Sequence, residues 1–358
     1  MWRWAKERLF VGGLFLVGAG VLAGAQVVPL VEAQQIAPGV PTLTAVKVTI
    51  PPKLDGSNVD EAWKKAPALE VPVAGGTIGF AMVTLKAVYT NTDIYLLAKW
   101  PDKTVNIEHH PYTYDGTKWT KPEGPLEDRF AIQWNISVAN FDKGSCALLC
   151  HSGDRYPDKL PRMHTNAPGE FTDEWHWKAA RSNPMGYVDD KYVDNTVDLK
   201  DDEAGHHADG GVRVYTGNKL KDEAPSFVWK GPSVSTPPGV SADRAKLFLL
   251  DTDKAPYSPT NPLTGKPWAK GDTVPVAILQ VPTESNADIK AYGVWKEGVW
   301  TLEVGRALDT KANAVKGDKK IDVVFDPSKV YYFGISVFDN SEAANHAFTG
   351  GPVALRFK

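Results

Sequence analysis

The stretch Phe130-Ala-Ile-Gln-Trp-Asn-Ile136 alternates large apolar side chains with small or polar ones, and its two-residue period is the cleanest in the chain. Successive side chains of a β-strand point to opposite faces, so Phe130, Ile132 and Trp134 would share one face. The stretch therefore predicts a strand that packs one face against an apolar core.

Similar alternation marks segments on either side of this stretch. Strands are predicted at 83–89 and 94–100 around the turn Asn91-Thr92-Asp93, at 289–295 and 299–304 around the turn Lys296-Glu297-Gly298, and at 331–337 and 353–357. A short helix is predicted over 60–66, with Ser57 or Asn58 as its N-terminal cap.

Strands that follow one another through short turns, without amphipathic helices between them, favour an antiparallel sandwich over any α/β fold. The predicted fold class is therefore mainly β. We expect an antiparallel β-sandwich, immunoglobulin-like or DOMON-like, with long loop insertions and short helices.

The middle of the chain, about 138–272, differs from the rest. It carries both cysteines, an acidic stretch over 189–209 and two Pro-rich loops, 231–239 and 255–267. Loops this long inside a compact domain are usually functional or ordered by a ligand. We interpret them as insertions between strands of one sandwich.

The N-terminal segment 1–33 is predicted to lie outside the fold. Basic residues near the start precede an apolar stretch over 9–25, and Ala23-Gly24-Ala25 fits a small-residue cleavage site. This pattern is typical of a signal peptide, although the apolar stretch approaches the length of a membrane anchor. Both readings place the remaining chain outside the cytoplasm, in the periplasm or its equivalent, with membrane attachment only through the N-terminus.

The charge pattern argues against nucleic-acid binding. The net charge is −3 and no long basic run occurs, whereas a nucleic-acid footprint needs clustered Lys and Arg. The many aromatic residues would serve equally to pack a core, to wall a cofactor pocket or to stack on sugars.

The segment Cys146-Ala-Leu-Leu-Cys150-His151 contains both cysteines of the chain. Two thiols followed at once by His are typical of c-type haem attachment, in which the thiols bond the haem and the imidazole binds its iron. The usual spacing is two residues, and here it is three. The alternatives are a small disulfide loop and a structural metal site, for which a fourth ligand is missing at standard spacing.

A longer set of motifs resembles one family. They are Glu127-Asp-Arg-Phe-Ala-Ile-Gln-Trp-Asn-Ile136, the cysteine segment, Asp173-Glu-Trp-His-Trp-Lys-Ala-Ala-Arg181 and Asn183-Pro-Met-Gly-Tyr-Val-Asp-Asp190, with Leu54-Asp-Gly56, Glu61-Ala-Trp63 and Phe338-Asp-Asn340 with His346 at the ends. Together they resemble the haem-binding domain of ethylbenzene dehydrogenase γ-subunits, also described as cytochrome c-552/DMSO-reductase-like. Similar proteins include the γ-subunit of nitrite oxidoreductase.

This resemblance implies a β-sandwich that relays electrons beside a molybdenum enzyme. The implied partners are molybdoenzyme catalytic and iron–sulfur subunits, or soluble redox carriers. Members with b haem use Met and Lys ligands, but Phe130-Ala-Ile-Gln-Trp134 contains no Met and the late Lys position corresponds to the region of His346. One covalent haem c is therefore expected, with haem b as the alternative.

Several residues are candidates for the second iron ligand. His346 is the first choice because of its place in the resemblance, followed by Met163 and His164 near the attachment segment. His176 is expected either to line the cofactor or to serve in a core hydrogen-bonding role. Lys178 and Arg181 are candidates to pair with haem propionates.

The domain and function predictions follow from these sites. Residues 34–358 are expected to form a single haem-binding sandwich, with an extended leader over 34–45 and the haem-attachment insertion at about 138–210. The expected role is electron transfer without substrate chemistry, so the chain would be a subunit and not an enzyme. Alternatives are a carbohydrate-binding sandwich and a haem enzyme such as a peroxidase.

One further cluster has the composition of a cation site. His206 and His207 stand near Asp201, Asp202 and Asp209, and imidazole with carboxylate suits a divalent metal. A solvated acidic loop is the alternative interpretation.

Overall fold

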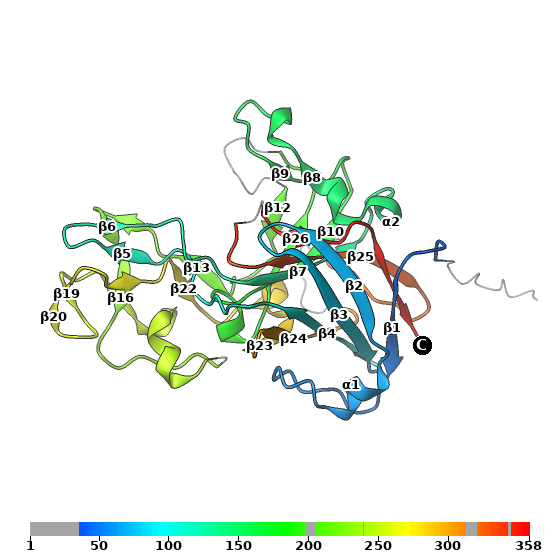
Figure 1. Ribbon diagram of the computed structural model, residues 1–358, viewed down its shortest axis with the longest axis horizontal. Helices are drawn as coiled ribbons and strands as arrows, with labels where there is room; N and C mark the ends of the chain where they lie inside the picture. The colour runs from blue at the N-terminus through cyan, green and yellow to red at the C-terminus, as the bar shows by residue number, and fades with distance from the viewer. Residues whose placement is uncertain (1–35, 198–204, 239, 312–320, 343–344) are drawn as a thin grey trace, which may run out of the picture. The chain divides into compact units, whose positions relative to one another are not determined.

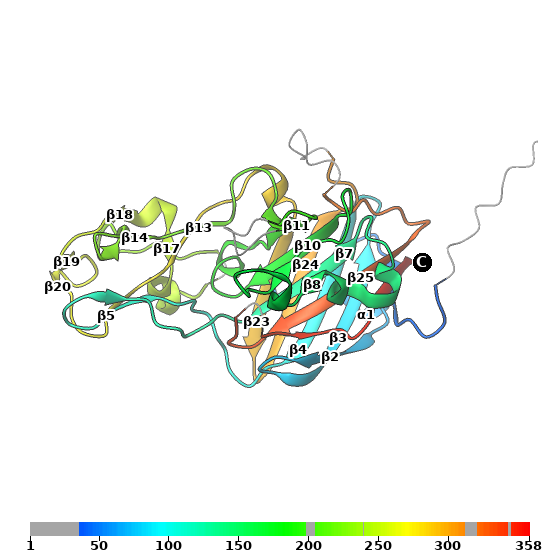
Figure 2. The same cartoon turned by 90° about the horizontal axis from the view of Figure 1, so that it is seen from above.

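In the part of the chain that the structure describes, thirteen strands form one large sheet that folds over on itself into two facing layers (Figures 1 and 2). The computed structural model describes residues 36–197, 205–238, 240–311, 321–342 and 345–358. The predicted export segment at 1–33 lies outside these residues. Among the residues that are described, no helix has the length and apolar character needed to cross a bilayer.

The strands of this sheet run in the order β12-β11-β10-β7-β25-β26-β2-β3-β4-β24-β23, with β1 and β27 attached beside it. Their bounds are β1 Thr42–Lys47, β2 Leu69–Gly75, β3 Gly79–Tyr89, β4 Asp93–Pro101, β7 Arg129–Asn135, β10 Thr172–Lys178, β11 Asp189–Val193, β12 His206–Ala208, β23 Lys290–Lys296, β24 Val299–Ala307, β25 Val330–Phe338, β26 Ala347–Phe348 and β27 Val353–Phe357.

The core lies between the two layers and is rich in tryptophan. Trp177 of β10 meets Trp100 of β4 at 6.0 Å and Trp300 of β24 at 5.0 Å between ring centroids, so the β10 layer faces the β4 layer. Trp134 of β7 contacts Phe333 of the neighbouring strand β25 in a tilted arrangement, with ring centroids 4.6 Å apart. Large aromatic rings bury much apolar area and favour such tilted and edge-on contacts, so this cluster is the main source of cohesion between the layers.

The predicted fold class is confirmed: the chain is a mainly antiparallel β-sandwich with short helices. The predicted hairpins correspond to β3–β4 and β23–β24, and the predicted strands at 331–337 and 353–357 to β25 and β27. The leader expected over 34–45 was wrong in part, because β1 begins at Thr42 and pairs with both β27 and β3. These two pairings are parallel.

The predicted helix corresponds to α1, Glu61–Lys65, but its expected cap was wrong. The residue before the helix is Asp60, and its side chain makes no capping hydrogen bond. The backbone N–H groups of Gly56 and Asn58 instead donate to the carboxylate of Glu303, at 2.7 and 3.2 Å. This buried carboxylate of β24 fixes the loop in a conformation that takes Ser57 and Asn58 away from the helix end.

The remaining helices are short. They are α2 Phe141–Gly144 and the 3-10 helices η1 Ser145–Leu149, η2 Gly153–Arg155, η3 Asn183–Met185, η4 Ala242–Leu247, η5 Asp251–Asp253 and η6 Glu284–Ala287.

The long insertions form small sheets and a second apolar cluster. This cluster includes Tyr112, Trp119, Trp229, Trp268 and Ile278. The strands concerned are β5 Tyr112–Tyr114, β6 Trp119–Thr120, β13 Tyr215–Gly217, β14 Leu220–Lys221, β15 Ala224–Pro225, β16 Phe227–Trp229, β17 Leu249–Leu250, β18 Lys254–Pro256, β19 Thr260–Asn261, β20 Lys266–Pro267, β21 Thr273–Val274 and β22 Ala277–Leu279, while β8 Cys150–His151 pairs with β9 Arg162–Met163. That 34–358 functions as a single domain stays a prediction.

Candidate functional site

The cysteine segment lies on the outer side of the β25 layer (Figures 1 and 2). Cys146 is buried on η1, Cys150 is exposed at the start of β8, and neither sulfur is in a disulfide. Cys146 packs over Gly334 of β25, where an added Cβ would come within 2.9 Å of its Sγ. The glycine thus makes room for the thiol on the sheet, and burial raises the pKa of both thiols, to about 12 for Cys146.

Strand β10 presents two different faces because its side chains alternate. Its odd-numbered residues Trp175 and Trp177 enter the core, so the even-numbered Glu174, His176 and Lys178 lie on the outer face. Register places Glu174 level with Gln133 and Gly334, and His176 level with Ala131 and Ser336. The outer face beside the buried thiol therefore combines ionisable side chains with small residues, whose side chains project little from the sheet.

His176 is the imidazole on this face with unused hydrogen-bonding capacity. It is 6% exposed, and neither ring nitrogen makes a hydrogen bond, although Nδ1 lies 3.1 Å from Oε1 of Glu174. Burial, with the nearby Lys178 cation, lowers the pKa of His176 to about 3, so the ring is neutral and able to ligate a metal. A carboxylate at Nδ1 is the usual support for a metal-binding histidine. His206 also pairs with Glu174.

Arg129 is the cation with unused donors on the same face. It is 4% exposed, and its Nε and one terminal nitrogen, Nη2, donate no hydrogen bond. Its nearest carboxylate is Glu127, with Nε and Oε1 3.5 Å apart, and its guanidinium lies 5.5 Å from the ring centroid of Phe338. Buried guanidinium N–H groups without partners are rare, so this position suits an anionic group of a ligand.

Three of the predicted ligands lie together on the β8–β9 hairpin and its continuation. His151 stacks on His164 at 4.0 Å, with its Nε2 3.2 Å from the His164 carbonyl oxygen and its Nδ1 beside Arg155. His164 is held at both ring nitrogens, by the Thr165 carbonyl and the Tyr156 hydroxyl. Ligation through Nε2 of His151 would require its contact with the His164 carbonyl to open.

The third of these residues, Met163, packs against Val138, Phe141 and Leu149. His346, the first choice from sequence for the second ligand, lies beside Phe338, with ring centroids 4.7 Å apart. Phe338 also stacks on His176, at 5.5 Å. Phe338 therefore contacts both His346 and His176.

The two predicted propionate partners are already paired with buried carboxylates. Lys178 forms an ion pair with Asp189, and Nε of Arg181 lies 2.5 Å from Oε1 of Glu127. Lys178 and Arg181 also approach the ring of Tyr215, at 5.1 and 5.0 Å from its centroid. Their role toward a haem stays a prediction, whereas Arg129 is a candidate that sequence reasoning missed.

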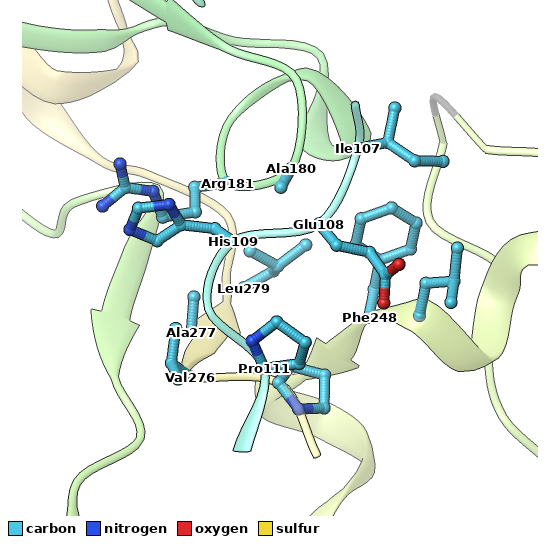
Figure 3. Close-up of a pocket in the computed structure, with 12 residues that line it drawn as sticks. Ile107, Glu108, His109, Pro111, Ala180, Arg181, Phe248, Val276, Ala277 and Leu279 are labelled. Carbon is cyan, nitrogen blue, oxygen red and sulfur yellow. The ribbon is translucent and has the colours of Figure 1, made fainter. Parts of the chain in front are cut away.

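A small pocket lies next to this charged group, where Figure 3 shows Arg181 and His109 side by side. Its wall is completed by apolar residues such as Phe248 and Leu279, and it has room for about one water molecule. It is therefore too small for a cofactor.

The cation site considered from sequence around His206 and His207 is not assembled as expected. His206 pairs with Glu174 and His207 with Asp194, whereas Asp209 is buried and accepts from Ser285. The carboxylates at 201 and 202 lie outside the described residues.

A β-sandwich whose outer face gathers two free thiols, a neutral buried imidazole and an unsatisfied guanidinium has the features of a cofactor-holding protein. Comparison gives the family: a sequence model described as Ethylbenzene dehydrogenase matches residues 60–347, and the chain belongs to that family. The predicted resemblance is thereby confirmed. Membership fits a haem-binding, non-catalytic subunit of an oxidoreductase complex.

Other comparisons are distant. A carbohydrate binding module family 9 from Caldicellulosiruptor kristjanssonii, in complex with glucose, is 10% identical, with 88% of this chain and 95% of that chain covered and a TM-score of 0.33. A putative carbohydrate-binding protein from Bacteroides uniformis is 8% identical, with 89% and 100% covered and a TM-score of 0.34. No protein of curated function matches the chain.

Proposed function

We propose that the chain is an exported c-type cytochrome that relays electrons between a periplasmic molybdenum-type oxidoreductase and another carrier. The observation that carries this proposal is the location of the free Cys146 and Cys150 on the same sheet face as His176 and Arg129, two buried side chains with unused nitrogens. Bound haem would supply one-electron chemistry at this face.

The residues present fit a covalently attached haem. Cys146 and Cys150 would hold it through thioether bonds, and His151, next in sequence, would provide one iron ligand. We assign the second ligand to His176 in preference to His346, because both His176 ring nitrogens are buried without hydrogen bonds and the Glu174 carboxylate lies 3.1 Å from Nδ1, where it could orient the ring of a ligand histidine. Arg129 would neutralise a propionate.

The fold would shape the properties of this site. Trp134 and Trp175, which lie on the core side of the same strands, exclude water from beneath the face. A dry, apolar setting tunes a haem potential, and two protein ligands leave no open position for a substrate. Relay therefore suits the site better than catalysis.

The carbohydrate-binding alternative has weaker support. Stacking on a sugar needs an exposed aromatic ring, and within the described ranges the exposed rings are those of Phe80 and Phe348, whereas every tryptophan is buried apart from the half-buried Trp295. The partners that we propose are the catalytic and iron–sulfur subunits of a molybdoenzyme, or a soluble redox carrier, and any membrane contact would be through 1–33.

Replacement of the second ligand tests this assignment. His176→Ala is expected to open one iron position, so that the reduced protein binds carbon monoxide rapidly at neutral pH. His346→Ala is the matched control and is expected to keep the six-coordinate, unreactive spectrum of the unmodified protein. Carbon monoxide binding by the His346 variant and not by the His176 variant would show that His346 is the ligand. Binding by the unmodified protein would favour a peroxidase-like enzyme.

A further inference from the structure

A buried group of carboxylates lies on the core side of β10, opposite the face that carries Glu174 and His176. One oxygen from each of Asp173, Asp190 and Asp322 lies within 4.8 Å of the others. Asp209 joins them through the hydroxyl of Ser285, which is 3.0 Å from Asp209 Oδ2 and 3.5 Å from Asp322 Oδ2. Four segments distant in sequence thus bring acidic oxygens to one place.

Several of these oxygens have no partner. Asp190 is 0% exposed, and neither of its carboxylate oxygens accepts a hydrogen bond. Asp173 and Asp209 each have a second unsatisfied buried oxygen, Oδ1 in both. Buried carboxylates are normally paired, hydrogen-bonded or bound to metal, so Asp190 requires an explanation beyond the contacts of the protein itself.

Among the described residues, the cation that contacts this group is Arg306 of β24. Its Nη1 donates to Asp173 Oδ2 at 2.8 Å, and its Nη2 donates to the hydroxyl of Thr310 and the carbonyl of Val323. A single guanidinium does not balance four carboxylates. Burial and mutual repulsion accordingly raise the pKa values of Asp190 and Asp209 well above the ordinary range.

We propose that Asp173, Asp190 and Asp322 bind one Ca²⁺ ion, with Asp209 linked to them through Ser285. The donors are all oxygens and come mainly from carboxylates, as hard cations require. Ca²⁺ bonds oxygen at roughly 2.3–2.6 Å, so ligands on opposite sides of the ion stand about 5 Å apart, a span that covers the spacing of the three clustered oxygens. Mg²⁺ usually keeps several waters and is bound by only one or two carboxylates, which suits this enclosed group less well.

The ion would have a structural effect. It would join the β10–β11 edge of the sheet to the segments around Ser285 and Asp322, and so hold in place the strand whose opposite face carries His176. The proposal does not depend on haem, because the acidic group and the thiols lie on opposite sides of β10.

Calcium binding by the purified full-length protein tests this inference. We expect protein prepared without chelator to contain about one equivalent of calcium per chain by elemental analysis. After chelator treatment and desalting, Ca²⁺ at about 100 times its Kd should raise the midpoint of thermal unfolding by on the order of 4 °C, whereas equal Mg²⁺ should have a smaller effect. Absence of calcium together with no thermal response to millimolar Ca²⁺, or an equal response to Mg²⁺, would overturn the proposal.

A variant pair separates binding from structural damage. Asp190→Asn removes a ligand charge but keeps the shape, so it should fold without Ca²⁺ and bind the ion at least about tenfold more weakly. Asp251→Asn removes an exposed carboxylate that pairs with Lys254. This variant should keep the full rise of the unfolding midpoint with Ca²⁺. An undiminished Ca²⁺ response in the Asp190 variant would contradict the assignment. If that variant fails to fold, the elemental analysis of the unmodified protein decides.

Discussion

The double substitution Cys146→Ser/Cys150→Ser is expected to abolish covalent attachment of haem. A hydroxyl group does not form the thioether bond, so haem would be held only by its iron ligands and would be lost on denaturation. Haem-dependent staining of a denaturing gel should fall to background. Each single variant should retain haem through its remaining thiol.

Ser145→Ala is the matched control for this experiment, because Ser145 is buried beside Cys146 but carries no thiol. It should stain like the unmodified protein. Full staining of the double variant would show that the thiols do not attach the haem, and it would leave haem b or another cofactor as the explanation for any colour.

The second large effect concerns Glu127, whose carboxylate organises the charges next to the site. It is 0% exposed, lies 2.5 Å from Arg181 Nε, and accepts the backbone N–H groups of Ala180 and Arg181 at 2.8 and 3.0 Å. Glu127→Gln would leave Arg181 and Arg129 buried without their counter-charge. We expect a loss of about 3–5 kcal/mol in the free energy of unfolding, measured by denaturant titration at pH 7.

The exposed pair Glu61–Lys64 provides the control. Glu61→Gln should change stability by less than about 1 kcal/mol, because exposed ion pairs contribute little. A similarly small effect of Glu127→Gln would contradict the buried network.

The pH dependence of the Glu127 contribution has a definite sign. Burial alone would raise its pKa, but Arg181, His109 and Arg129 outweigh burial and hold the pKa at about 2. The folded-state pKa is therefore below the unfolded value, so this stabilisation is present above the unfolded pKa and is lost as the pH falls toward 2. The difference in the free energy of unfolding between the unmodified protein and Glu127→Gln should therefore decrease over that acidic range.

The strands with regular alternation were predictable from sequence, including β7, which is buried on both faces, whereas β10 was not. Strands β3, β4 and β25 show one apolar face and fall where the pattern places them. Every residue of β10 is buried, with charged side chains on both faces, so its sequence has no clean alternation. The following Asp189–Val193 looks like an acidic loop, but it forms β11 by antiparallel pairing with β10, and Asp189 forms ion pairs with Lys178 and Arg213.

Those parts of the candidate site whose residues are adjacent in sequence were predictable. Cys150 and His151 are consecutive in sequence and could be recognised as a haem-attachment pattern. The pairing of Glu174 with His206 and the unused nitrogens of Arg129 depend on strand register and burial, which the sequence does not display. Arg129 does stand next to the alternating stretch that starts at Phe130, on the face opposite to it. That position could have marked it as a residue of the outer face.

A pyridine haemochrome spectrum of protein washed with acidified acetone shows whether haem is covalently attached to this chain. Haem that is not bonded to protein is extracted by the wash, whereas thioether-bonded haem remains. We expect a c-type spectrum in the washed protein at about one haem per chain, in keeping with its single pair of cysteines. A colourless protein after the wash, with all haem in the extract or none in either fraction, would contradict covalent attachment.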